Sequence, residues 1–553
     1  MKKYLLSILT FILPLLIFAQ EKSLSESIND AFARYTKPIV DLIFYPIEVA
    51  GKSLPIVLVL LLVGAFFFTV YFKGINFRYI KISLLTAFGK YDHLDHHVPA
   101  DEDIEVENGK IIGAIKIEGE APGELTHFQA LTASLSATVG LGNIAGVAVA
   151  IAIGGPGATI WMILAGVLGM ATKFVECTLG VKYREVDEEG KTYGGPMYYL
   201  TTGLGELGMK GFGKVLAVFF AVMCIGGSFG GGNMFQSNQA ASQLIDLAGF
   251  TNPNAGLYIG IVLAIVVGLV IIGGIKRIGK VTEKVVPFMA IVYVGAGLII
   301  IGINYDMIPY AINEIWEGAI KPNAAFGGIV GVLIVGFQRA AFSNEAGVGS
   351  AAIAHSAVKT RYPASEGLTA LLGPFVDTVI ICSMTAIVII ITNAKHKLFS
   401  YGNLDASSNV ILTGSNEPIG GVGLTSLAFD SAIPHFSIVL SIAIVLFAVS
   451  TMISWSYYGL QAWKYLFGKG KVSDTVYKLL FLVFLVVGAS SGLEAVIGFS
   501  DAMIFAMVFP NIIGLVLLSP KVNQELKKYL SAIKMDKMDA TISKRDTTVK
   551  EVK

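Results

Sequence analysis

The chain has 553 residues, of which 54% are hydrophobic and 15% are charged, and its mean hydropathy is +0.69. A soluble domain carries about 25% charged residues, so the composition excludes a soluble globular protein and predicts an all-α protein that crosses a membrane several times. The net charge of +1 gives no indication of a nucleic-acid partner. The sequence contains neither a nucleotide-binding glycine motif nor a zinc-binding histidine motif, and its three cysteines lack metal-ligand spacing, which argues against an enzyme.

The N-terminal residues 1–20 have the pattern of a signal peptide. Lys2 and Lys3 precede a short apolar core that ends in Phe18-Ala-Gln20. The alternative is a signal anchor that is retained. Residues 21–53 mix charged and apolar side chains and predict an amphipathic lead-in outside the membrane.

Eleven apolar segments long enough to span a bilayer follow the signal. The segment at 54–75 stands apart, and a polar linker at 76–126 separates it from the rest. The other ten segments form two groups of five, 127–304 and 324–520, with a loop at 305–323 between them. Because five is an odd number, the second group runs opposite to the first, which predicts an inverted 5+5 repeat with one extra N-terminal helix. The predicted spans are 54–75, 127–154, 157–182, 214–247, 255–275, 284–304, 325–358, 366–393, 435–465, 474–492 and 495–519.

Basic residues predict the orientation of these segments. If the signal places residue 21 outside, the predicted inside loops carry most of the lysines and arginines. The predicted outside loops between spans contain only Lys321, Lys395 and Lys397. This pattern predicts a protein of the inner membrane of a bacterium, with its N-terminus outside after cleavage and the charged tail at 521–553 in the cytoplasm.

Glycine-containing stretches interrupt the leading segment of each group of five. The first break, Ser136-Ala-Thr-Val-Gly-Leu-Gly-Asn-Ile-Ala-Gly146, interrupts the segment at 127–154. The second break, Arg339-Ala-Ala-Phe-Ser-Asn-Glu-Ala-Gly-Val-Gly-Ser350, interrupts the segment at 325–358. Helices broken at corresponding positions of two halves indicate the substrate site of a transporter, because such backbone is tolerated only where it is buried in protein or lines a cavity.

A broken helix offers backbone groups of both polarities. Its free N–H groups suit a carboxylate, and its free carbonyls suit Na⁺ or an ammonium group. In the first break, Gly140 and Gly142 let the backbone approach a ligand closely, and Asn143 offers a side-chain carbonyl to a cation. In the second break, Phe342 can form the floor of a small pocket, while Ser343 and the two residues before it present carbonyls to an ammonium group. The alternative is that the glycines serve only helix packing.

Polar residues on the span at 435–465 are further candidates. Thr451 and Trp455 are four residues apart and share one helix face, so a hydroxyl and an indole form one wall. The hydroxyls of Ser450, Thr451 and Ser454 are suited to complete an oxygen shell for Na⁺. Hydrogen bonding between helices is the alternative role for these hydroxyls.

Charged residues inside membrane spans require partners. Arg339 and Glu345 flank the second break and are predicted to pair, which would hold the break in shape or gate it. Lys173 and Glu176 are three residues apart on a helix and are predicted to form a local ion pair. Asp377 is either a structural carboxyl group or a carrier of protons.

Five motifs in order resemble the alanine/glycine:cation symporter family, the sodium:alanine symporters. The resemblance covers about 120–520 together with the extra span at 54–75. The motifs are Thr138-Val-Gly-Leu-Gly-Asn-Ile-Ala-Gly-Val-Ala148, Gly154-Gly-Pro-Gly157, Gly194-Gly-Pro-Met-Tyr-Tyr199, Phe342-Ser-Asn-Glu-Ala-Gly-Val-Gly-Ser350 and Trp455-Ser-Tyr-Tyr-Gly459. The family belongs to the amino acid–polyamine–cation superfamily, so the resemblance implies a LeuT-type fold and Na⁺-coupled uptake, H⁺-coupled in some members, of alanine or glycine.

The resemblance also assigns residues to the site, with core helices numbered along the ten spans. It implies that the substrate lies between core helices 1, 3, 6 and 8, at Gly140, Leu141, Gly142, Asn143, Gln236, Phe342, Thr451 and Trp455. It implies that the Na⁺ ligands are Val139 and Asn143 on core helix 1, with Ser450, Thr451 or Ser454 on core helix 8. The chain departs from the family pattern at Leu141, where the family often has Thr, at Ala340-Ala341, where it often has Gly-Leu, and in a longer segment at 90–120. The departures at Leu141 and Ala340-Ala341 touch the site, so they bear on substrate preference.

We therefore expect a symporter that imports small neutral amino acids with Na⁺ by alternating access. A site that closes on Phe342 and Trp455 has little room beyond a methyl group, which favours alanine and glycine. One alternative is a proton-coupled transporter of the same substrates, and another is a membrane sensor that binds an amino acid without transporting it. Beyond the amino acid, the coupling ion and the lipid bilayer, the sequence indicates no obligate partner.

Overall fold

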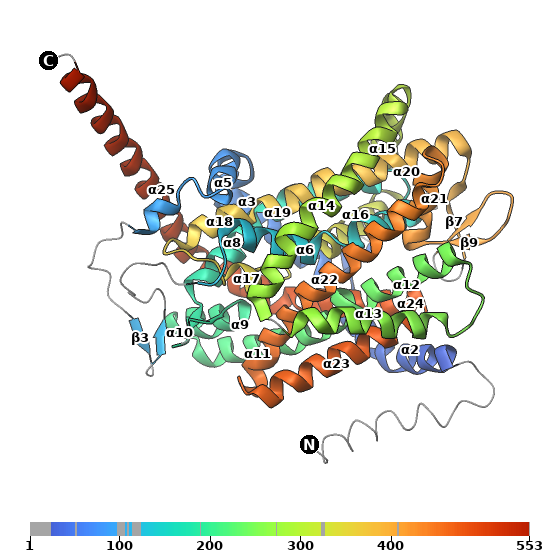
Figure 1. Ribbon diagram of the computed structural model, residues 1–553, viewed down its shortest axis with the longest axis horizontal. Helices are drawn as coiled ribbons and strands as arrows, with labels where there is room; N and C mark the ends of the chain where they lie inside the picture. The colour runs from blue at the N-terminus through green and yellow to red at the C-terminus, as the bar shows by residue number, and fades with distance from the viewer. Residues whose placement is uncertain are drawn as a thin grey trace.

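The computed structural model describes most of the chain as helices. The described residues are 24–49, 52–96, 105–107, 110–112, 123–188, 190–272, 274–321, 327–405 and 409–551. The predicted signal peptide at 1–20 lies outside these residues. Figure 1 shows long helices packed side by side, with the end of α25 leaving the helical body.

Among the described residues, seven helical stretches are long and apolar enough to cross a membrane, and a bent pair raises the number to eight. They are α8 (Ala158–Lys182), α11 to α12 (Lys210–Ala248), α14 (Gly274–Ile303), α18 to α20 (Pro363–His396), α22 (Phe436–Phe467), α23 (Lys471–Ser490) and α24 into α25 (Leu493–Asp536), with α6 and α7 as the bent pair. Shorter apolar helices are α3 (Ile56–Tyr71), α13 (Ala255–Ile271) and α16 (Gly328–Asn344). Every predicted span overlaps one of these helices, whereas the count of eleven spans and the 5+5 repeat stay predictions.

The bent pair corresponds to the first break. Helix α6 (His127–Thr138) begins with a capping box, in which Thr126 and Gln129 satisfy each other's backbone amides. The chain then turns by 52° before the π-helical turn η2 (Gly142–Gly146) and α7 (Val147–Gly154). The second break separates α16 from α17 (Ala351–His355). Both predicted interruptions are therefore present in the fold.

Smaller elements connect the long helices. Residues 305–323 were expected as a loop, but most of them form α15 (Ile308–Ile320), because Ala311, Ile315 and Ala319 recur at helical spacing and are buried. The remaining elements are α2 (Leu24–Ile43), β1 (Pro46–Val49), β2 (Lys52–Pro55), α4 (Ile75–Arg78), α5 (Ile80–Ala87), η1 (Asp92–His96), β3 (Glu105–Glu107), β4 (Lys110–Ile112), β5 (Glu185–Val186), β6 (Thr192–Tyr193), α9 (Pro196–Tyr198), η3 (Tyr199–Gly203), α10 (Leu204–Glu206), η4 (Gly230–Met234), η5 (Tyr305–Met307), α19 (Leu372–Pro374), η7 (Phe375–Cys382), β7 (Phe399–Leu404), β8 (Val410–Leu412), β9 (Pro418–Ile419) and α21 (Gly421–Ala432).

Two sets of packing contacts position the breaks. Helix α8 packs against α16, α17 and α18, so it lies along the second break. Helix α22 packs against α6, α11, α12 and α14 and lies beside the first break. The breaks are thus enclosed by neighbouring helices, which is where unpaired backbone is tolerated in a membrane protein.

A buried polar cluster joins the beginnings or ends of three helices. Glu366, in the first turn of α18, hydrogen-bonds through one carboxylate oxygen to His127 Nδ1 and through the other to His355 Nδ1. All three side chains are buried. We call these residues the His127–Glu366–His355 cluster; it ties the start of α6 and the end of α17 to α18.

Arg184 and helix α25 (Val508–Glu551) stabilise the end of the molecule that contains the His127–Glu366–His355 cluster. The guanidinium of Arg184 donates to the carbonyls of Ser356 and Thr360 at 2.8 Å each, just beyond α17. Burial lowers the pKa of Arg184 to about 10, so this side chain stays charged at neutral pH. Tyr529 on α25 shares a 2.9 Å hydrogen bond with Thr86 on α5.

Candidate functional site

The two breaks lie against each other. A Cβ atom placed on Gly142 in the first break would lie 3.3 Å from the Cα of Ser343 and 3.6 Å from Cδ1 of Phe342 in the second break. Sequence reasoning assigned these three residues to one site, and the structure brings them together. Glycine permits this approach because a larger side chain would meet the facing backbone.

Neutral side chains hold the backbone of the first break. The Gly140 amide donates to Asn143 Oδ1 at 3.0 Å, and the Leu141 amide donates to Gln236 Oε1 at 3.2 Å. Gln236 also donates from Nε2 to the carbonyl of Gly231 at 3.0 Å. The amides that the break releases are therefore satisfied by uncharged amide groups, as buried backbone requires.

Helix α22 is joined to the first break by reciprocal hydrogen bonds. Thr451 Oγ1 donates to the carbonyl of Ser136, and Ser136 Oγ donates to the carbonyl of Ser450, at 2.9 Å each. A Cβ atom on Gly140 would lie 2.5 Å from Thr451 Oγ1, so a side chain at this position would displace the threonine. In the described part of the chain, the buried hydroxyl of Ser454, one turn further along α22, has no hydrogen-bond partner.

The second break frees carbonyl groups. Helix α16 makes its last helical hydrogen bond from the Glu345 amide to the Ala341 carbonyl at 3.0 Å. The Gly347 amide, which would continue the helix to Ser343, donates instead to Glu176 Oε1 at 2.9 Å. The end of α16 thus presents a carbonyl without its helical donor, at the negative end of the helix dipole.

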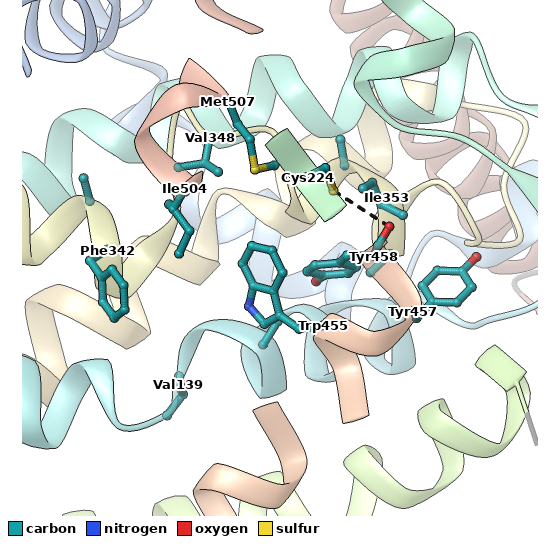
Figure 2. Packing of buried hydrophobic residues seen from close by; sticks show 14 of the residues in the cluster. Val139, Cys224, Phe342, Val348, Ile353, Trp455, Tyr457, Tyr458, Ile504 and Met507 are labelled. Atoms are coloured by element: carbon teal, nitrogen blue, oxygen red, sulfur yellow. Dashed lines mark hydrogen bonds between the residues drawn. The ribbon is translucent and has the colours of Figure 1, made fainter. Parts of the chain in front are cut away.

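Aromatic side chains line the region between the breaks. Phe342 meets Phe235 edge to face, with ring centroids 5.2 Å apart. The indole of Trp455 packs directly on the backbone of Gly232, where a Cβ atom would overlap it. Figure 2 shows the two rings with Ile504 beside them and Val139 on the first break. Both rings pack against the glycines of η4, and the lack of a side chain at Gly232 explains why the indole fits.

The predicted Arg339–Glu345 ion pair is wrong. Arg339 pairs instead with Asp501 on α24, and both side chains are buried. Glu345 accepts a 3.0 Å hydrogen bond from Trp455 Nε1 and another from Ser350 Oγ. Arg339 lies on α16, whereas Glu345 is the residue after the helix and has a left-handed backbone with φ 56°, so helical spacing does not bring the two side chains together.

The predicted Lys173–Glu176 pair is absent as well. Within the described residues, Lys173 Nζ is buried and has no hydrogen-bond partner. Glu176 Oε1 accepts from Asn511 Nδ2 at 2.7 Å in addition to the Gly347 amide. The carboxylate therefore supports the second break instead of neutralising its own helix neighbour.

Asp377 was missed as part of the site. Its carboxylate accepts hydrogen bonds from Asn143 Nδ2 at 2.7 Å, Ser343 Oγ at 2.8 Å and Thr378 Oγ1 at 2.7 Å. It thus links the first break to the second from the π-helical segment η7. A carboxylate in the middle of an apolar segment was the available signal, but its partners Asn143 and Ser343 lie on other segments.

Several apolar helices enclosing two broken helices that meet beside buried polar groups define the class of secondary transporters. Residues 41–543 match the sodium:alanine symporter family, and the chain belongs to this family. It is therefore a cation-coupled amino acid symporter of a membrane and not an enzyme.

Relatives of the chain carry names of carriers for different amino acids. The sodium/alanine symporter AgcS of Methanococcus maripaludis is 38% identical over 476 residues, which cover 86% of this chain and 94% of the relative. The putative sodium/proton-dependent alanine carrier protein YrbD of Bacillus subtilis is 33% identical, with 82% and 88% covered. The probable sodium/glutamine symporter GlnT of Bacillus subtilis is 34% identical, with 73% and 78% covered.

Proposed function

We propose that the protein imports alanine or glycine together with Na⁺ by alternating access, and that the meeting point of the two breaks is the substrate site. The observation that carries the proposal is the contact of Gly142 with Phe342 and Ser343. This contact supports a site at which the carbonyls at the end of one broken helix and the amides of the other bind the same ligand. A zwitterionic amino acid has one group for each.

The substrate carboxylate binds at the first break by replacing Gln236. The Gln236 Oε1 atom accepts from the Leu141 amide at 3.2 Å, in the position where a carboxylate oxygen would accept. A carboxylate is the stronger acceptor, because charge-assisted hydrogen bonds are about twice as strong as neutral ones. The displaced Gln236 can then donate from Nε2 to the same carboxylate. Gly140, Leu141, Gly142 and Asn143 supply the backbone of this half of the site.

The ammonium group and the side chain bind at the second break. The carbonyls at the end of α16, including those of Phe342 and Ser343, accept from the ammonium group. The substrate methyl group packs between Phe342 and Trp455, and Thr451 completes the wall. Small amino acids are favoured because both rings are held in place, Phe342 by Phe235 and Trp455 by Gly232.

Na⁺ binds between α6 and α22. Its ligands are oxygens of Val139, Asn143, Ser450, Thr451 and Ser454. The buried Ser454 hydroxyl without a partner supports this assignment, since a buried polar group requires one. The reciprocal hydrogen bonds of Ser136 with Ser450 and Thr451 keep the two helices in register.

In the cell, the protein lies in the inner membrane, with its signal removed and α25 ending in the cytoplasm. The basic residues of the inside loops support this orientation. In this orientation, the His127–Glu366–His355 cluster closes the cytoplasmic end.

Uptake of labelled alanine into liposomes that contain the purified protein tests the coupling. Uptake should require an inward Na⁺ gradient and fall to background when K⁺ replaces Na⁺. Undiminished uptake in K⁺ would exclude Na⁺ coupling. Competition by glycine, L-alanine, D-alanine, serine and glutamine then ranks the substrates, and glutamine as the best competitor would contradict the proposed small site.

A proton-coupled carrier of the same substrates is the second candidate. The name of the relative YrbD includes both ions, and Asp377 lies between the two breaks with three hydrogen-bond donors. Uptake that persists in K⁺ and requires an inward proton gradient would favour this candidate. Asp377→Asn should then abolish the proton dependence.

A further inference from the structure

One face of α8 lies directly along the second break. Gly169 is so close to Ala346 that a Cβ atom on the glycine would lie 2.7 Å from Cβ of the alanine. Lys173 and Glu176 follow four and seven residues later and therefore share this face. This face carries an ammonium group and a carboxylate, and the carboxylate contacts the Gly347 amide of the second break.

Three ionisable side chains meet in this place, and all are buried. Lys173 and Glu176 come from α8, and Glu345 comes from the second break. Both oxygens of Glu345 are satisfied, one by Trp455 and one by Ser350. The two carboxylate oxygens of Glu176 differ. Oε1 accepts two hydrogen bonds, whereas Oε2 has no partner among the described residues.

The charges of these groups do not cancel. One ammonium and two carboxylates sum to one net negative charge, because +1 and −2 give −1. A buried charge without compensation is costly, and such a group neutralises instead. Asp377, the next carboxylate along the break, accepts three hydrogen bonds and can only add to the negative charge.

We propose that Lys173, Glu176 and Glu345 form a proton-binding site, separate from the substrate and Na⁺ sites, in which Glu176 Oε2 carries one proton while the second break has this conformation. The proposal rests on the proposed transport function. The proton comes from water when the Gly347 amide docks on Glu176 and returns to water when the break opens. A proton fits better than Na⁺, because a single carboxylate oxygen is free, whereas a hard metal cation requires several oxygen ligands.

The site is linked to the substrate through the second break. Gly347 holds Glu176, and Glu345 in the same break holds the Trp455 indole. The charged groups that face Glu176 are Lys173 on its own helix and Glu345 in the break, and Asp377 of η7 faces Glu345 and Lys173. Asn511 of α25 is neutral and contacts Glu176 directly, and the titratable Tyr199 of η3 faces Glu176 and donates to Asn511 Oδ1. Opening of the break should therefore change both proton binding and the substrate wall.

Infrared difference spectroscopy of the purified full-length protein tests for the proton on Glu176 and does not depend on transport activity. Glu176→Gln keeps the shape and the Oε1 acceptor but removes the titratable group. The wild type should show a protonated-carboxyl band that is lost in Glu176→Gln. Glu317→Gln, on an exposed pair with Lys321, is the matched control and should keep the band. A band that persists in Glu176→Gln would overturn the proposal.

The pH profile of alanine uptake at a fixed Na⁺ gradient tests the link to transport. The wild-type rate should change by up to about tenfold per pH unit on one limb of the profile, as for a single titrating group, and Glu176→Gln should flatten this limb. Lys173→Met should move the limb to higher pH, because the proton is held more strongly without the ammonium group. The proposal is overturned if the pH profiles of the variants and the wild type superimpose. It is also overturned if a higher Na⁺ concentration displaces the proton from Glu176. Absence of Na⁺-dependent uptake by the wild type would instead contradict the proposed function, and the infrared result would still decide the site.

Discussion

The two breaks have the same backbone chemistry but different surroundings. The backbone of the first break is held by uncharged groups, chiefly Asn143, Gln236 and Thr451, and the Asp377 carboxylate contacts the break only through the Asn143 side chain. The second is framed by ionisable groups, with Arg339 paired to Asp501 on one side and Glu345 and Glu176 on the other. Neutral amides can exchange partners at low cost, whereas buried charges cannot lose theirs. The first break can therefore give up its backbone amides to a ligand, whereas the second break keeps its shape.

The largest expected effect follows from breaking the charge pair beside the second break. Asp501→Asn leaves the Arg339 guanidinium buried and unpaired, which should lower the free energy of unfolding by about 3–5 kcal/mol. Thermal unfolding in detergent measures this loss. Asp41→Asn, in the exposed Lys37–Asp41 pair, is the control and should unfold like the wild type. Equal stability of the two variants would remove the contrast between the breaks.

A side chain in the first break should impair transport more than stability. Gly140→Ala places a Cβ atom 2.5 Å from Thr451 Oγ1 and 3.3 Å from Gln236 Oε1. We expect the KM for alanine to rise about 10- to 100-fold, equivalent to about 1.4–2.8 kcal/mol of binding free energy. Gly146→Ala is a matched control, because no atom lies within 4 Å of a Cβ there. Unchanged uptake kinetics in Gly140→Ala would argue against a ligand at this break.

The indole of Trp455 tests the connection between the second break and the substrate wall. Trp455→Phe leaves Glu345 Oε1 without its donor, which should cost about 1–3 kcal/mol of stability and admit larger amino acids. The control is Trp463→Phe, whose indole donates at 2.9 Å to the hydroxyl of Ser473 in a half-buried position. Competition by serine and glutamine measures the change in selectivity. A pattern identical to that of the wild type would show that the indole does not limit substrate size.

The smallest effect on stability is expected at Ser454. Its hydroxyl is buried without a partner among the described residues, so Ser454→Ala should leave the free energy of unfolding within about 0.5 kcal/mol of the wild type. The Na⁺ concentration for half-maximal uptake should nevertheless rise severalfold. Ser441→Ala on the same helix should lower the free energy of unfolding and leave the Na⁺ dependence unchanged, since Ser441 makes hydrogen bonds of 2.6 and 2.8 Å. An unchanged Na⁺ dependence in Ser454→Ala would remove this serine from the proposed cation site.

The sequence was sufficient to locate both breaks, because glycines within apolar segments are visible without a structure. It also grouped Gly140, Phe342 and Trp455 at one site, partly through the family resemblance. The sequence could not predict which residues on different helices bind each other. Arg339 and Asp501 are 162 positions apart, and spacing along a helix reports only which residues share its face. The same limit explains why the contacts of Asp377 were missed and why Lys173 was assigned to its nearest neighbour on the helix.

The His127–Glu366–His355 cluster has a consequence for how this end of the molecule opens. One carboxylate serves two imidazoles, so α6 cannot leave α18 without disturbing the carboxylate that also holds α17. Separate opening of either helix would leave a buried polar group without its partner. The three helix ends should therefore behave as one latch that releases in a single step. Hydrogen exchange at the starts of α6 and α18 and at the end of α17 should accordingly follow one common opening rate.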